Sequence, residues 1–286
     1  MNAASIEIKD LVVRYGDFTA VDGLNLAIPP GELFGFLGPN GAGKTSTIKV
    51  LTGNQHPTAG HVKVAGFAIP DRFEEAKPMF GYVPDTENHI DEFSGKENLQ
   101  LFAELYGIPE TRIDDLLARL ELSEAANTAA GNYSKGMRRK LLIAREILHE
   151  PAVLYLDEPT ANLDAHSTKL VRELLRDLAG RGTTIFLTTH NMEEVEQICD
   201  RVAIMCRGKL VECDTPTAFV TRHAERFVDA QFERDGAVVR ESFNMDEEAH
   251  RQQLARVVES EDCVTVHSQE FDFHDVFLKI TGQAYA

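Results

Sequence analysis

Apolar and polar residues alternate at the start of the chain, with the two-residue period of a half-buried strand. Ile6-Glu7-Ile8 and Leu11-Val12-Val13 are separated by Lys9-Asp10, and Leu24-Asn25-Leu26-Ala27-Ile28 follows a Gly16-Asp17 turn. One face of each segment would pack on a core while the other face meets water. The pattern predicts an antiparallel sheet here.

Three later segments are continuously apolar, which is typical of strands covered on both faces. They are Leu33–Leu37, 152–156 and Thr184–Thr188. Apolar residues spaced at three and four predict helices over Lys44–Leu51 and over about 167–179. Strands that alternate with helices predict an α/β fold with a parallel sheet and helices on both faces.

The stretch between these strands, about 86–150, has the spacing of helices alone and predicts a helical insertion. Its apolar positions include Leu99, Phe102, Ala103, Tyr106, Leu116, Leu117 and Leu120.

A new pattern begins after Asp214-Thr215-Pro216, and it predicts a small α+β domain over 216–286, separate from a domain over 1–215. Val228-Asp229-Ala230-Gln231-Phe232 and Ala237-Val238-Val239 flank Arg234-Asp235-Gly236, which predicts a hairpin. A helix over 246–258, a strand over 263–266 and a helix over 273–280 would complete this domain.

Charge and hydropathy narrow the possible functions. The 29 basic and 46 acidic residues give a net charge of −17, which disfavours a sequence-independent partnership with nucleic acid. No apolar run approaches the roughly 20 residues that span a bilayer. The first residues, Met1 to Glu7, lack the basic and apolar segments of a secretory signal, so we expect a cytosolic protein.

A phosphate-binding loop follows the strand Leu33–Leu37 and opens the next helix. Its GxxxxGK[ST] pattern lets backbone N–H groups and a helix N-terminus face phosphate oxygens. Lys44 would contact the β and γ phosphates, and the hydroxyl of Thr45 would bind Mg²⁺. A glycine-rich turn without a ligand is the alternative, which the complete strand–loop–helix context disfavours. The candidate ATP-binding residues are Gly38, Pro39, Asn40, Gly41, Ala42, Gly43, Lys44, Thr45 and Ser46.

Two carboxylates stand at the end of the strand over 152–156. Asp157 is the expected second anchor of Mg²⁺, and Glu158 is the candidate general base for an attacking water. Successive residues at a strand end point in different directions, so the two can take different roles. A solvated acidic loop is the alternative, and Pro159-Thr160 and Leu163-Asp164 make it a poor one.

Further motifs occur in the order that is typical of one family. Together with the phosphate loop and the acidic pair, they make residues 5–215 resemble the ATP-binding subunit of an ABC transporter. Tyr133-Ser134-Lys135-Gly136-Met137 resembles the family signature, Ala161-Asn162-Leu163-Asp164 its D-loop, and His190 its switch histidine. The resemblance implies a P-loop NTPase core with an antiparallel β subdomain and a helical subdomain. Asp275 to Gly282 resembles the chain ending of drug-, lantibiotic- and polysaccharide-type exporter ATPases. An amphipathic closing helix, with Val276, Phe277 and Ile280 facing inward, is the alternative.

The signature stands where a helix begins, because Ser134 is a good N-cap and Gly136 permits close approach to a phosphate. By resemblance, this end meets the γ-phosphate of an ATP molecule held by the other subunit. The residues implied in that contact are Ser134, Lys135, Gly136, Met137 and Asp164. The neighbouring basic run of Lys135, Arg138, Arg139 and Lys140 is predicted to be a solvated helix face near phosphate, with a nucleic-acid patch as the disfavoured alternative.

Three more residues take roles from the resemblance. His190 would contact the γ-phosphate and the attacking water, and Tyr15 would stack on adenine. Asp85 stands where the family usually has a glutamine that faces Mg²⁺ and water. Aspartate offers only acceptors and adds a charge. We still expect hydrolysis, because acidic residues occur there in the exporter-like branch.

The function predicted from the sequence is an ATP-binding and ATP-hydrolysing subunit. Two copies, or one copy and a homologous subunit, would enclose two ATP molecules with Mg²⁺ and drive a separately encoded integral-membrane permease, in an exporter by resemblance. The protein would then lie on the inner face of the cell membrane. The alternatives are a soluble ABC-type ATPase that acts on ribosomes or chromosomes, and a nucleotide-binding regulator without turnover.

Overall fold

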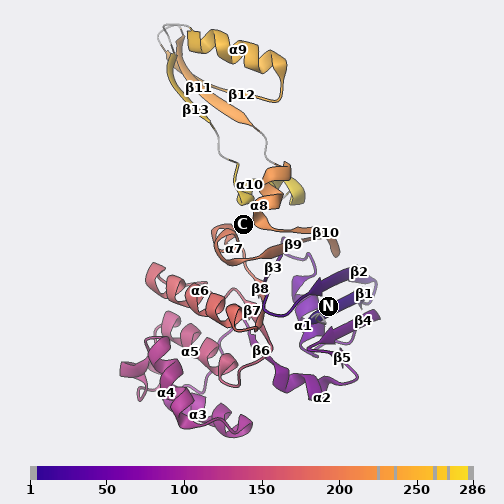
Figure 1. The fold of residues 1–286 in the computed structure, drawn as a ribbon, viewed down its shortest axis with the longest axis vertical. Helices are drawn as coiled ribbons and strands as arrows, with labels where there is room; N and C mark the ends of the chain where they lie inside the picture. Colours follow the sequence, from indigo (N-terminus) through magenta and orange to yellow (C-terminus); the bar gives the residue numbers. More distant parts are fainter. Residues whose placement is uncertain (1–4, 224–225, 235–236, 260–262, 269–270, 283–286) are drawn as a thin grey trace. The chain divides into compact units, whose positions relative to one another are not determined.

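The computed structural model describes residues 5–223, 226–234, 237–259, 263–268 and 271–282. The chain divides into two compact units, Met1–Asp214 with Ala284–Ala286, and Thr215–Gln283. Figure 1 shows the elements of both units. The first unit contains two sheets and the second unit contains one, and each unit has its own helices.

The first unit opens with a four-stranded sheet in the order β2-β1-β4-β5, and all its neighbouring strands pair antiparallel. Its strands are β1 (Ile6–Tyr15), β2 (Phe18–Ile28), β4 (Ala59–Val64) and β5 (Phe67–Ile69).

The two segments predicted before Tyr15 form the single strand β1. Its pairing with β2 shifts register between Ile8 and Leu11. Asp10 there has φ of 49°, and its backbone N–H and side chain both bond the side chain of Asn25. The polar pair that was predicted to separate two segments is therefore an irregularity within one strand.

The second sheet has six strands in the order β10-β9-β3-β8-β7-β6. The pairs β3–β8, β3–β9, β6–β7 and β7–β8 are parallel, which confirms the predicted α/β fold, and β10 pairs antiparallel with β9. The strands are β3 (Leu33–Leu37), β6 (Phe80–Val83), β7 (Val153–Asp157), β8 (Thr184–Thr188), β9 (Arg201–Cys206) and β10 (Lys209–Asp214).

Helix α1 (Lys44–Leu51) lies beside the first sheet in Figure 1 and buries Ile48 and Leu51 in a core shared with both sheets. The other helices around the strands are α2 (Phe73–Ala76), α6 (Ala165–Gly180) and α7 (Met192–Ile198). Because β3, β7 and β8 run parallel, their carboxyl ends meet at one edge, where α/β sheets bind ligands.

Between β6 and β7 the regular elements are helical. They are α3 (Gly95–Tyr106), α4 (Glu110–Arg119) and α5 (Lys135–Ile147), with three-residue 3₁₀ turns at Ser123–Ala125 and Ala130–Asn132. Ser94 and Glu97 form a capping box that fixes the start of α3. Helix α5 packs against β6 and thereby places its first turns near the strand ends.

The second unit contains a three-stranded antiparallel sheet in the order β12-β11-β13, and α9 covers one face around Phe232, Phe243 and Leu254. Helices α8 and α10 pack together through Phe219 and Phe273. The predicted hairpin strands pair as expected, while Asp235 and Gly236 of its turn lie outside the described residues. The elements are α8 (Pro216–His223), β11 (Phe227–Arg234), β12 (Ala237–Asn244), α9 (Glu248–Glu259), β13 (Cys263–Ser268) and α10 (Phe273–Thr281).

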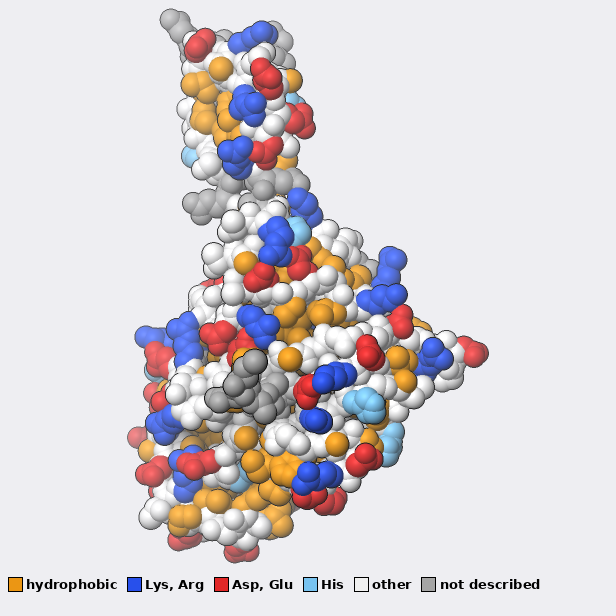
Figure 2. All heavy atoms as spheres, turned by 45° about the vertical axis from the view of Figure 1, so that its right-hand side comes forward, with side chains coloured by type: hydrophobic (Ala, Val, Ile, Leu, Met, Phe, Trp, Pro, Cys, Tyr) orange, Lys and Arg blue, Asp and Glu red, His pale blue; other side chains and the backbone are white. Residues whose placement is uncertain are grey.

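The surface is charged and mixed in sign. On the face drawn in Figure 2, Lys and Arg side chains are interspersed with Asp and Glu side chains, so this face presents no continuous basic patch. Among the described residues, no helix combines the length and the apolar character that a bilayer crossing requires.

Candidate active site

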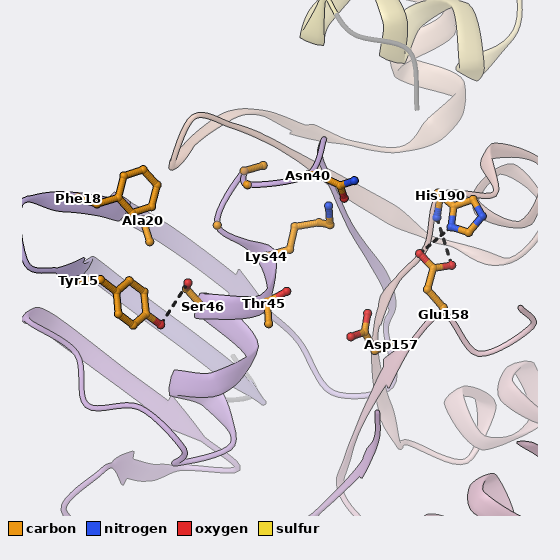
Figure 3. A pocket seen from close by; sticks show the side chains of 13 residues that line it. Tyr15, Phe18, Ala20, Asn40, Lys44, Thr45, Ser46, Asp157, Glu158 and His190 are labelled. Carbon is orange, nitrogen blue, oxygen red and sulfur yellow. Dashed lines mark hydrogen bonds and ion pairs between the residues drawn. The ribbon is translucent and has the colours of Figure 1, made fainter. Parts of the chain in front are cut away.

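A cavity of about 340 Å³ lies where the first sheet, α1 and the carboxyl ends of β7 and β8 meet. Figure 3 shows Lys44 and Thr45 on one side of it and Asp157, Glu158 and His190 on the other. It is lined by Tyr15, Phe18, Ala20, Asn40, Gly41, Ala42, Gly43, Lys44, Thr45, Ser46, Asp157, Glu158 and His190.

The glycines of the loop before α1 fit where a side chain would not. Gly43 has φ of 108°, and a Cβ built there would lie 2.5 Å from the carbonyl oxygen of Ala20. A Cβ on Gly38 would lie 2.3 Å from the carbonyl oxygen of Met205. Both positions require the close backbone approach that glycine alone permits. The loop is therefore held against β2 and β9, with the N-terminus of α1 at the cavity.

Lys44 is the first residue of α1 and folds back over the loop. Its Nζ donates to the carbonyl of Gly38 and, at 3.2 Å, to that of Pro39. Gly38 and Pro39 thus support the lysine, although neither lines the cavity. Burial lowers the pKa of Lys44, while the charges of Glu158 and Asp157 oppose that shift. An anionic ligand would favour the same charged form as these carboxylates do.

The acidic side of the cavity is tied to the end of β8. Asp157 accepts a hydrogen bond from the hydroxyl of Thr188, and the backbone N–H of Glu158 donates to the Thr188 carbonyl at 2.9 Å. Oε1 of Glu158 lies 2.9 Å from Nδ1 of His190, and Oε2 accepts from the Thr189 hydroxyl at 3.2 Å. Because a carboxylate only accepts, this contact places a proton on Nδ1 of His190. The predicted base and the switch histidine are thus direct partners.

Aromatic side chains mark the opposite end of the cavity. Tyr15 is 43% exposed, and its hydroxyl lies 3.4 Å from the hydroxyl oxygen of Ser46. Phe18, at the start of β2, is 61% exposed and lines the same cavity. The sequence analysis missed Phe18; its position directly after the Gly16-Asp17 turn could have indicated a second exposed aromatic.

The donor atoms of the cavity suit a small hard cation. The hydroxyl of Thr45 and the carboxylate of Asp157 are oxygen donors that line the same cavity. Mg²⁺ prefers oxygen ligands and is usually held by one or two protein groups, with waters and phosphate oxygens in the remaining positions. These two residues therefore fit Mg²⁺. Asp85, the third predicted ligand, is not among the cavity-lining residues.

The predicted signature residues lie outside the cavity. Ser134 is the exposed N-cap of α5, and its hydroxyl accepts from the Met137 N–H at 3.2 Å, which confirms the predicted cap. A Cβ on Gly136 would lie 3.4 Å from a side-chain methyl of Leu163. Asp164 caps α6 by accepting from Ser167, and this bond lowers the pKa of the Asp164 carboxyl. All five residues predicted to act on a partner's ATP lie outside the lining of this cavity. They are Ser134, Lys135, Gly136, Met137 and Asp164.

The prediction of a solvated basic face is wrong for two of its four residues. Lys135 is exposed and Arg138 is half-buried, but Arg139 and Lys140 are only 4% and 6% exposed. The guanidinium of Arg139 donates to the carbonyls of Asp157 and Glu158. The reason is that the second turn of α5 packs beneath the ends of β6 and β7, whose last carbonyls leave the sheet and need donors.

The burial of one carboxyl in α7 was not predicted from the sequence. Glu194 in α7 has no exposed surface. Burial raises the pKa of the Glu194 carboxyl. In the sequence, the pair Glu193-Glu194 has the appearance of an exposed first helical turn, because acidic residues are common there.

A buried strand, a glycine loop that carries lysine and threonine, and an acidic pair at a neighbouring strand end together define a P-loop nucleoside triphosphatase. Sequence comparison places the chain more narrowly. The ABC transporter family profile matches residues 21–161. A fluoroquinolones export ATP-binding protein of Mycobacterium tuberculosis is 36% identical over 286 residues, covering 97% of this chain and 93% of the relative. The chain belongs to the ABC transporter family, as an ATP-binding subunit with ATPase activity.

Other relatives and solved structures agree with this assignment. Nod factor export ATP-binding protein I of Burkholderia pseudomallei is 40% identical over 224 residues, covering 77% of this chain and 74% of the relative. A solved ATP-binding subunit of an ABC transporter superposes with a TM-score of 0.71 at 28% identity, covering 76% of this chain and 92% of that chain. The cbiO1 protein of Clostridium perfringens superposes with a TM-score of 0.69 at 25% identity, covering 77% and 92%. The predicted family and fold are thereby confirmed.

Proposed function

We propose that this protein is the ATPase subunit of an exporter, that it works as a dimer around two ATP molecules, and that it drives a separately encoded permease. The observation that carries this proposal is the composition of the cavity. It joins a phosphate loop to Asp157, Glu158 and His190, yet the signature residues of the same chain stand elsewhere. Each chain thus offers one nucleotide cavity and one separate signature.

In this proposal, adenine stacks on Tyr15 and the phosphates lie in the loop before α1. The ring of Tyr15 is exposed, so a base can cover it without displacing core residues. Lys44 contacts the β and γ phosphates. Thr45 and Asp157 hold Mg²⁺. Asp85 does not line the cavity, so its proposed contact with the metal and water requires it to move inward when the nucleotide binds. The bound cation neutralises charge that develops on the phosphate oxygens.

Glu158 is the residue proposed to accept a proton from the attacking water. Its carboxylate is engaged by His190 at 2.9 Å and by Thr189 at 3.2 Å. The main-chain N–H of His190 is a third donor, at 3.4 Å from Oε2. A carboxylate held by three donors is oriented, and turning the His190 side chain away would free Oε1 to accept from water. His190 is 61% exposed on its side chain, so it has room to turn toward a γ-phosphate. Positioning and electrostatics, rather than covalent chemistry, would then set the rate.

The signature supplies the second half of each site in this proposal. Ser134 is exposed at the start of α5, and the helix N-terminus favours negative charge. A phosphate held by another chain can approach it from solvent. Two chains placed head to tail would each give a phosphate loop to one site and a signature to the other. ATP would close such a dimer, and hydrolysis would release it.

The partner and the direction of transport rest on two further observations. Leu101 and Leu105 lie one turn apart on α3 and are 46% and 74% exposed, so they give a neighbouring protein an apolar contact. The two relatives described above are both named for export, of fluoroquinolones and of Nod factor. Both names include export, but the exported compounds differ. We therefore propose only the direction of transport, export, for this protein and no transported compound. Attachment to a permease would place the protein at the cytoplasmic face of the membrane.

The variant Glu158→Gln tests this function. The amide cannot accept the proton, so turnover is expected to fall by a factor on the order of 10² or more while ATP binding persists. Steady-state phosphate release and equilibrium ATP binding measure the two quantities. Glu193→Gln, an exposed glutamate in the first turn of α7, is the matched control and is expected to keep wild-type turnover. Turnover of Glu158→Gln within about threefold of wild type would remove Glu158 from the role of base.

A further inference from the structure

Arg139 is a buried cation on the helix that begins with the signature. It lies in the second turn of α5 and is 4% exposed. Its guanidinium donates to four main-chain carbonyls, two of which are Pro84 at 2.5 Å and Pro159 at 3.3 Å. The others are Asp157 and Glu158, the latter at 2.6 Å.

These four carbonyls belong to the segments that carry the proposed chemistry. Pro84 directly precedes Asp85, and Asp157 and Glu158 are the proposed metal ligand and base. Glu158 has φ of 51°, in the left-handed region that residues with a side chain seldom adopt. Such a conformation persists only where surrounding contacts enforce it. The hydrogen bonds from Arg139 are contacts of that kind, because they hold the carbonyls on both sides of the Glu158 Cα.

The charge of Arg139 also suits this place. Burial lowers the pKa of Arg139, while the carboxylates of Asp85, Asp157, Glu87 and Glu158 oppose the shift. A guanidinium stays protonated in proteins, so a permanent cation lies among these acids. Its planar fork of donors can satisfy several carbonyls at once, which the single ammonium of a lysine cannot do equally well.

Arg145 shows what a purely structural arginine on this helix looks like. Its side chain is 5% exposed, and it bonds Asn88 and Glu146 and covers the ring of Phe102. None of these contacts reaches a cavity-lining residue. The two arginines thus lie on the same helix and have the same charge and similar burial. They differ in their hydrogen-bond partners, because only Arg139 bonds the backbone of Asp157 and Glu158.

We propose that Arg139 is a positioning residue for Glu158, and that through it the signature helix of a subunit is fastened to that subunit's own base. The proposal rests on the proposed function, in which Ser134 contacts a nucleotide held by the partner. The first turn of α5 then serves the partner's site, and the second turn serves the site of its own chain. A shift of α5 on binding the partner's nucleotide moves the backbone of Glu158 and of Asp85.

The first test compares Arg139→Met with Arg145→Met in the full-length protein. Both variants lose a buried guanidinium, so both are expected to lower the melting temperature. Arg139→Met is expected to lower kcat at least about tenfold while KM for ATP stays within about threefold, because Arg139 does not line the cavity. Arg145→Met is expected to keep kcat within about threefold of wild type. A kcat of Arg139→Met above a tenth of the Arg145→Met value overturns the proposal.

Arg139→Lys keeps the proposal testable if the methionine variant does not fold. Lysine retains the charge and can satisfy part of the carbonyl set, so its kcat is expected to lie between those of wild type and the methionine variant. If only the lysine variant folds, a kcat at least about threefold below wild type supports the proposal, and a smaller loss overturns it.

A double-mutant cycle separates positioning of the base from a general loss of order. Arg139→Met is combined with Glu158→Gln, and single-turnover hydrolysis of radiolabelled ATP measures the slow rates. If Arg139 acts through Glu158, the tenfold loss shrinks to within about threefold when the base is already absent. An undiminished loss overturns the proposal. If Glu158→Gln alone hydrolyses ATP normally, the proposed function fails instead, so the two failures are distinguishable.

Discussion

The phosphate loop and the signature are both glycine-containing segments at the start of a helix, yet they differ in what surrounds them. The loop before α1 is enclosed by β1, β2 and the ends of β7 and β8, and it lines a cavity of about 340 Å³. The start of α5 is exposed, and its cap Ser134 bonds only within its own helical turn. The loop lines a cavity of its own chain, whereas the described signature residues do not line that cavity.

This difference shows that a helix N-terminus alone does not make a complete phosphate-binding site. It supplies donors and a favourable dipole, but affinity and chemistry need further groups that converge on the same ligand. Around α1 those groups are Lys44, Thr45 and Asp157. At the start of α5, the expected ligand is a nucleotide held by a second subunit. The phosphate loop of that second subunit is expected to supply the further groups.

The largest expected effect is a difference in ATP affinity between a variant at the start of α1 and a variant at the start of α5. Lys44→Ala removes the half-buried ammonium from the phosphate site, and charge-assisted bonds contribute about 1.5–3 kcal/mol each, so ATP affinity should fall on the order of 10²-fold. Ser134→Arg should leave the affinity of the isolated subunit within about threefold, because Ser134 does not line the cavity. Both variants should abolish turnover.

Calorimetric titration with ATP at a protein concentration that keeps the chain monomeric measures the affinities. Asn132→Arg, which adds the same positive charge at an exposed position two residues before the cap, controls for surface charge near the start of α5. A 10²-fold affinity loss in Ser134→Arg would contradict the comparison, since the signature would then complete the cavity of its own chain.

A smaller effect is expected at Asp85, which follows β6. Asp85→Gln should keep ATPase activity within about tenfold, because both side chains present an oxygen toward metal and water. Asp85→Ala should lower it further, in steady-state phosphate release. Equal activity of the aspartate and alanine forms would show that Asp85 lies outside the working site.

The smallest effect on binding is expected from removing residues 216–286. Every cavity-lining residue lies before Asp214, so a folded truncation should bind ATP within about threefold of the full chain. Circular dichroism confirms folding, and the same titration measures affinity. Loss of ATP binding in a folded truncation would show that the C-terminal unit completes the site; changes in dimerisation alone would not.

Much of the site was predictable because its chemical groups belong to short, contiguous sequence motifs. A glycine loop between a buried strand and a helix predicts a phosphate site, and α1 spans Lys44–Leu51 as the pattern predicts. Asp157 and Glu158 were found because a strand end in a parallel sheet points to the ligand edge. Each of these inferences needs only a few neighbouring residues.

The remainder depends on contacts between distant segments. Arg139 belongs to a basic run, and nothing in that run shows that the carbonyls after β6 and β7 need donors. Glu194 resembles an exposed helical glutamate, although the fold buries it completely. Lys9-Asp10 resembled a break between strands because the bond from Asp10 to Asn25 is invisible in the sequence.

The central claim is that one chain's phosphate loop and another chain's signature form each working site. Mixed dimers test it most directly: one subunit carries Lys44→Ala and the other carries Ser134→Arg, each inactive as a homodimer. If the signature acts across the interface, one of the two sites combines an intact Lys44 with an intact Ser134. If it acts within its own chain, both sites carry a defect.

The measurement is ATPase activity together with trapped nucleotide in mixed dimers purified through two different tags and verified by mass. Trapped nucleotide is scored because cooperation between sites can suppress turnover alone. We expect one occupied site per mixed dimer and recovered turnover at or below half of the wild-type rate. Recovery of neither signal, in verified mixed dimers, would contradict the two-subunit site.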